Sequence, residues 1–77
     1  MEIKEFVKNF ASLFEDTDAN EFSEESKFRE FEEWSSFMAL SVMALSDDMY
    51  GIKLNGEDIQ SSKTINDLFE IVKSRIK

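Results

Sequence analysis

The sequence predicts an all-α protein, and three observations lead to this prediction. The chain has no proline and only two glycines, so few residues would interrupt a helix. Apolar residues recur at spacings of three and four, and the strict alternation of a half-buried strand is missing. At 77 residues the chain has room for one small core. We therefore expect a single helical domain that spans residues 1–77.

The first helix is predicted over about residues 2–14, where one apolar stripe faces the core and charged residues cover the other side. The stripe consists of Ile3, Phe6, Val7, Phe10, Leu13 and Phe14. The polar run at residues 16–20 is expected to end this helix.

An acidic segment follows, and residues 15–33 contain nine of the seventeen acids, opposed only by Lys27 and Arg29. A connection of this length is unusual in a compact domain. Phe22, Phe28 and Phe31 can attach it to the core, and a short helical turn is expected near Ser26. We predict a solvated acidic surface rather than a metal site, because the segment lacks the glycine and final glutamate of a calcium loop.

The second helix is predicted over residues 36–49, after Trp34. Ser35 can act as the N-cap, which makes Ser36 the first helical residue with an exposed hydroxyl. Its expected buried stripe is Met38, Val42, Leu45 and Met49. Further apolar residues on the flank exceed what one stripe needs, and we expect them to be partly exposed or to line a cavity. These flanking residues are Phe37, Leu40, Met43 and Ala44.

Two shorter predictions complete the chain. Gly51 can take the left-handed conformation that ends a helix, and Asn55-Gly56 precedes a brief helix over residues 57–60 that Ile59 would anchor. Thr64 then caps the last helix, with Asp67 as its capping-box partner. The buried face of that helix is expected to be Ile65, Leu68, Phe69, Val72 and Ile76.

Composition excludes several functional classes. Without cysteine or histidine, the chain has no evident nucleophile–base pair, so we expect no catalytic activity of its own. A net charge of −8 disfavours nucleic acid and favours basic protein surfaces as partners. No apolar run reaches the roughly 18 residues of a membrane span. We expect a cytoplasmic monomer.

Two stretches of the chain, residues 34–37 and residues 50–54, resemble the acyl carrier protein family. Trp34-Ser35-Ser36-Phe37, with the apolar run that follows, is similar to the Asp-Ser-Leu motif that opens the family's second helix. The stretch from Tyr50 to Leu54 is similar to the turn that closes it. Ser36 matches the family serine, while Ser35 replaces the usual aspartate and Phe37 the usual leucine.

The resemblance implies a four-helix bundle with a long first loop and a short third helix. It implies that a phosphopantetheinyl transferase attaches 4′-phosphopantetheine to Ser36, and that the arm carries acyl groups as thioesters to acyl-transferring or condensing enzymes. Fatty acid, polyketide or related synthesis would be served. The residues implied in docking are Ser35, Phe37, Leu40, Met43, Asp47 and Asp48.

Alternatives remain at two points. An alignment on residues 42–45 alone shifts the register by one and selects Ser35 instead of Ser36. The serine pair is also explained as a plain helix cap. In that case the chain is an unmodified acidic helical adaptor that binds a protein partner through its second helix.

Overall fold

The computed structural model describes residues 2–76, which contain four α-helices and two 3₁₀ turns joined by irregular segments. The helices are α1 (Ile3–Ala11), α2 (Ser36–Tyr50), α3 (Gly56–Ser61) and α4 (Ile65–Arg75), and the turns are η1 (Ala19–Glu21) and η2 (Phe28–Glu30). These residues include no strand, which confirms the all-α prediction. The helix α3 has only six residues, which confirms the predicted short third helix.

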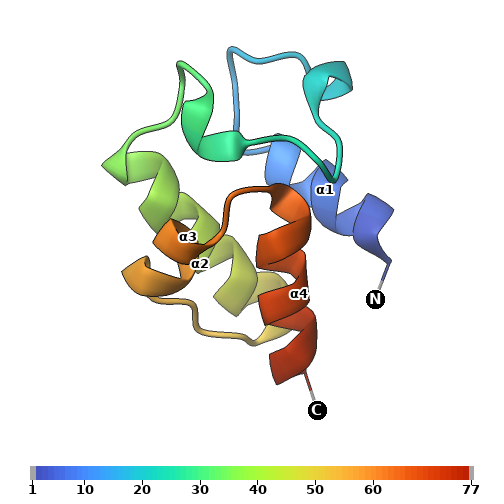
Figure 1. Cartoon of the computed structure of the whole chain (residues 1–77), viewed down its shortest axis with the longest axis vertical. Helices are drawn as coiled ribbons and strands as arrows, with labels where there is room; N and C mark the ends of the chain where they lie inside the picture. The colour runs from blue at the N-terminus through green and yellow to red at the C-terminus, as the bar shows by residue number, and fades with distance from the viewer. Residues whose placement is uncertain (1, 77) are drawn as a thin grey trace.

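The long connection at residues 12–35 runs across one end of the helices (Figure 1). In the same view α4 lies between α1 on one side and α2 with α3 on the other, and it packs against both α1 and α3. The rings of Phe6 in α1 and Phe69 in α4 meet edge to face, with their centroids 5.4 Å apart.

The helix α1 is shorter than predicted, because it ends at Ala11 rather than near residue 14. The chain tightens there: the N–H groups of Leu13 and Phe14 donate to carbonyls three residues back instead of four. Phe14 is nevertheless buried, as the apolar stripe predicts.

Aromatic rings fasten the long connection to α1. Phe22 and Phe28 are buried and Phe31 is partly buried, which confirms their predicted role as anchors. The Phe28 ring meets Phe10 of α1 at 5.2 Å. The Phe22 ring meets Phe14, which lies in the connection itself just after α1, at 5.0 Å. Pairs at these separations add to the stabilisation from burial alone.

Hydrogen bonds join the two ends of the same connection to each other and attach its middle to α4. The Glu33 carboxylate accepts hydrogen bonds from the backbone N–H groups of Glu15 and Asp16, at 2.9 and 3.1 Å, and from the Thr17 hydroxyl at 2.9 Å. Near the middle, carbonyls of the connection accept from the first N–H groups of α4, those of Ile65 and Asn66. The connection is therefore a fixed part of the fold. The turn η2 confirms the short helical turn predicted near Ser26, and η1 is a second turn that the sequence did not predict.

The ends of α2 follow the sequence prediction, but two of its four predicted buried positions do not. Gly51 closes the helix with a φ of 68°, in the left-handed region. Leu45 is only partly buried. Met49 was predicted to be buried and is 52% exposed, whereas Ser46 is buried and its hydroxyl donates to the carbonyl of Ile52. The buried positions follow the i+4 row from Met38 to Ser46, which is inclined to the helix axis. Met49 lies outside this row, so its side chain is exposed to solvent.

Capping boxes open the last two helices. Asn55 begins α3 with Asp58 as its partner, and Thr64 begins α4 with Asp67, as the sequence predicts for α4. Ile59 is buried, as expected. Ile76 was predicted to lie on the buried face of α4, but it is exposed because the helix ends at Arg75 and the backbone then becomes extended.

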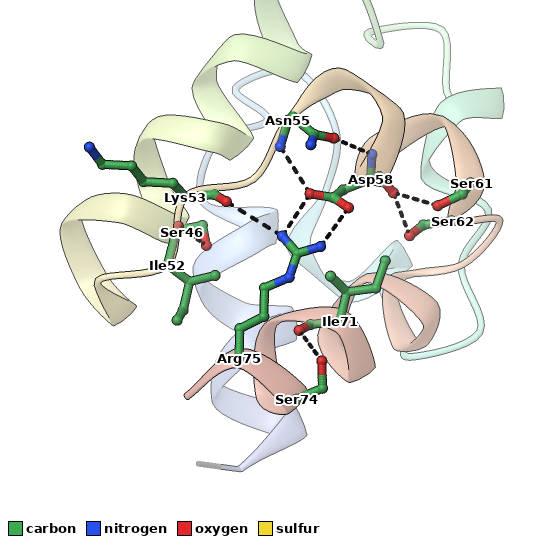
Figure 2. Close-up of polar contacts among 10 residues, drawn as sticks. All are labelled: Ser46, Ile52, Lys53, Asn55, Asp58, Ser61, Ser62, Ile71, Ser74 and Arg75. Atoms are coloured by element: carbon green, nitrogen blue, oxygen red, sulfur yellow. Dashed lines mark hydrogen bonds and ion pairs between the residues drawn. The ribbon is translucent and has the colours of Figure 1, made fainter. Parts of the chain in front are cut away.

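An ion pair joins the end of α4 to the start of α3. Figure 2 shows the Arg75 guanidinium facing the Asp58 carboxylate, with two N–O distances of 2.8 Å. The Arg75 side chain, followed by the Asn55 backbone N–H, lowers the pKa of Asp58 below its usual value, while burial opposes this effect. The ionised carboxylate therefore stabilises the folded state.

Acid should weaken this contact, and Asp58→Asn should remove it. Because the pKa is depressed in the folded state, the stabilisation is complete above the ordinary value of 3.8 and is lost as the pH falls through the lower folded value. At neutral pH we expect Asp58→Asn to reduce the free energy of unfolding by about 1 kcal/mol. Urea denaturation between pH 2 and pH 7 measures both effects.

The exposed Asp47 offers a matched control for that experiment. Asp47→Asn removes one carboxylate that makes no side-chain hydrogen bond within residues 2–76. Stability should therefore fall in acid less steeply for Asp58→Asn than for Asp47→Asn. Equal slopes for the two variants would contradict a stabilising role for the Asp58 carboxylate.

Candidate functional site

The two serines that open α2 have different surroundings. Ser35 has an extended backbone and its hydroxyl accepts a hydrogen bond from the Met38 N–H at 3.3 Å, so Ser35 is the predicted N-cap. Ser36 is the first helical residue, and its side chain is exposed. Within residues 2–76 the Ser36 hydroxyl makes no hydrogen bond, which leaves it accessible for chemistry from outside.

Trp34 fixes the approach of the chain to this serine pair. Its ring lies edge to face with Phe28 at 5.1 Å and is stacked on Phe14 at 6.3 Å. Its backbone N–H also donates to the carbonyl of Phe31. The partly buried Trp34 ring is thus held by Phe14 and Phe28, directly before the Ser35 cap. These contacts limit the positions that Ser36 can take.

An open pocket of about 400 Å³ lies beside Ser36. The start of α2, the helix α3 and the long connection all contribute to it. Its lining combines apolar groups with polar ones: Arg29, Trp34, Ser35, Ser36, Ala39, Gly56, Ile59 and Gln60. A linear group attached to Ser36 would find both a surface to lie on and hydrogen-bonding partners there.

The outward face of α2 is apolar near Ser36 and acidic further along. Phe37 is 73% exposed and Leu40 62% exposed, and Ala44 continues the same face. The predicted docking residues Asp47 and Asp48 follow at the helical spacing and are also exposed. Met43 is only partly exposed, because it packs against the core.

The structure brings to the site residues of α3 and one charged residue of the long connection, Arg29, none of which the sequence indicated as site residues. Arg29 lies seven residues before Ser36, and in the sequence it only offsets neighbouring acids. The turn η2 and the packing of Phe28 carry it to the pocket beside Ser36. No periodicity or motif links these positions, since the connection between them is irregular.

Comparison of the chain with protein-family models, with curated proteins and with solved structures gives no match.

Among residues 2–76, no helix combines the length and the apolar character that crossing a membrane requires.

Proposed function

We propose that this chain is an acyl carrier protein, modified at Ser36 with 4′-phosphopantetheine. The observation that carries the proposal is the exposed Ser36 hydroxyl at the first residue of α2, next to a serine that is already engaged as the cap. The four-helix layout, the long first connection and the short third helix are those that the resemblance implies.

The residues of the site suit such an attachment. The Ser36 hydroxyl oxygen would bond to the phosphorus of the pantetheine phosphate in coenzyme A, displacing adenosine 3′,5′-bisphosphate, while the hydroxyl proton passes to a base of the transferase. The chain itself supplies the oxygen and holds it in place through Trp34 and the Ser35 cap. The arm then supplies the thiol that carries the acyl group, which a chain without cysteine lacks.

A direct test uses the chain, coenzyme A and a broad-specificity phosphopantetheinyl transferase. Intact mass spectrometry should show the addition of one phosphopantetheinyl group per chain. An unchanged mass, under conditions where an established carrier protein is fully modified, would overturn the proposal.

The outward face of α2 leads to a prediction about the partner enzymes. Phe37 and Leu40 offer apolar contacts beside the attachment serine, so docking should depend on them more than on Asp47 and Asp48. Leu40→Glu should weaken the affinity for the transferase by about tenfold or more, which corresponds to about 1.4 kcal/mol. Asp47→Asn combined with Asp48→Asn should change it by less than about threefold. Isothermal titration calorimetry gives both constants.

Circular dichroism should first establish that each variant is folded. Leu40 is a better probe than Met43, because the Leu40 side chain is exposed and its replacement leaves the core intact. Affinity lost in the aspartate variant, and retained after Leu40→Glu, would show that charge directs docking.

The same apolar face favours a second candidate function, an unmodified adaptor that binds a protein partner through α2. Two measurements distinguish the two candidates. An adaptor would bind its partner equally well after Ser36→Ala and would remain unmodified in the presence of coenzyme A and transferase.

A further inference from the structure

Three of the nine basic side chains gather at one place on this acidic protein. Lys27, Arg29 and Lys63 line a pocket of about 440 Å³ together with a single acid, Glu30. Lys27 and Arg29 come from the long connection, whereas Lys63 lies between α3 and α4. Arg29 also lines the pocket beside Ser36, so the two pockets share this residue.

The Arg29 guanidinium is oriented by the fold but is not neutralised by it. Its Nε–H donates to the carbonyl of Ser62 at 3.2 Å, which holds the group against the turn between α3 and α4. Within residues 2–76 its two terminal nitrogens make no hydrogen bond, and no carboxylate lies within ion-pair distance of them. The other arginine, Arg75, contrasts with this, because Asp58 occupies both of its terminal nitrogens.

We propose that Arg29 binds the phosphodiester that joins the phosphopantetheine arm to Ser36, with Lys27 and Lys63 adding positive potential from the adjoining pocket. This inference rests on the proposed function. Arg29 would then hold the start of the arm on the surface of the carrier, in the pocket lined by Trp34 and Ile59.

The chemistry of the phosphodiester supports this assignment. Its phosphorus is bonded to the Ser36 oxygen, so its charged oxygens must remain beside the pocket that Arg29 lines. A guanidinium presents paired N–H donors that match two phosphate oxygens. On a chain of net charge −8, a further negative charge is opposed by the general field, and a local group of cations relieves that repulsion.

The presence of only two arginines makes a sharp experiment possible. In a ¹⁵N-labelled protein, the guanidinium region of the nuclear magnetic resonance spectrum contains the Nε–H signals of Arg29 and Arg75. Conversion of the unmodified to the modified protein should shift the Arg29 signal and leave the Arg75 signal in place, since Asp58 already pairs with Arg75. The Arg29→Lys variant assigns the two signals.

The ³¹P signal of the modified protein gives an independent measurement. Arg29→Gln should move this signal towards that of the same phosphodiester in the unfolded modified protein, whereas Lys53→Gln, which removes one positive charge from a residue outside both pockets, should leave it unchanged. If Arg29→Gln does not fold, the wild-type arginine spectrum decides the question alone.

The possible failures are distinguishable. An Arg29 signal that stays in place on a chain shown by mass to be modified would overturn the role of Arg29 and leave the carrier function standing. Equal shifts of Arg29 and Arg75 would indicate a general change of the fold and would also overturn it. A chain that takes no phosphopantetheine would overturn both proposals.

Discussion

Ser36→Ala should abolish the attachment of phosphopantetheine, whereas Ser35→Ala should leave the modification at Ser36. The reason lies in the different hydrogen bonds of the two hydroxyls. Ser35 accepts from the Met38 N–H as the cap of α2, while the Ser36 hydroxyl is exposed and makes no bond within residues 2–76. Intact mass after incubation with coenzyme A and transferase, followed by peptide mapping, measures the extent and the position of modification.

Two variants at the cap keep this test free of folding effects. Ser35→Ala should lower stability by about 1 kcal/mol through loss of the cap, and Ser35→Asp should restore it, since aspartate and serine cap helices about equally well. Both should be modified at Ser36. Modification that survives Ser36→Ala and disappears in Ser35→Ala would show that the neighbouring serine is the acceptor.

The second large effect should come from Phe28→Ala. Phe28 is fully buried, and its ring contacts both Phe10 and Trp34. Removal of a buried phenylalanine ring typically costs about 3–5 kcal/mol. Small domains have a total stability of about 5–15 kcal/mol, so this variant should be close to unfolding at room temperature. Urea denaturation followed by circular dichroism gives the difference.

Phe37→Ala is the matched control, because it makes the same substitution at a side chain that is 73% exposed. Its free energy of unfolding should differ from that of the wild type by less than about 0.5 kcal/mol. Similar losses in the two variants would mean that the long connection does not depend on its aromatic anchors.

Local chemistry explains which parts of the fold were predictable. The Ser35 cap, the Gly51 terminus and the Thr64–Asp67 box depend on residues within one helical turn, so the sequence alone indicated all of them. The burial of Ser46 in place of Met49 depends on the angle at which α2 meets its neighbours. That angle is a property of the assembled fold, and helical periodicity does not contain it.

The candidate site likewise contains some residues that the sequence predicts and others that only the fold brings together. Ser35, Ser36, Phe37 and Leu40 lie on one short helical stretch, and their exposure follows from the pattern of that stretch. The pocket beside Ser36 also needs Ile59 from α3 and Arg29 from the long connection. Arg29 is placed there by the packing of Phe28 against Trp34 and by its hydrogen bond to the Ser62 carbonyl, which are tertiary contacts that helical periodicity does not contain.

Trp34 is an intrinsic fluorescent probe for this protein. It is the only tryptophan in the chain, and it stands one residue before the cap of α2 and lines the pocket beside Ser36. Indole emission changes with the polarity around the ring, so its wavelength reports at once on the packing of the long connection and on occupation of that pocket. Ligand binding and unfolding can therefore be followed in the unlabelled, unmutated protein at micromolar concentration.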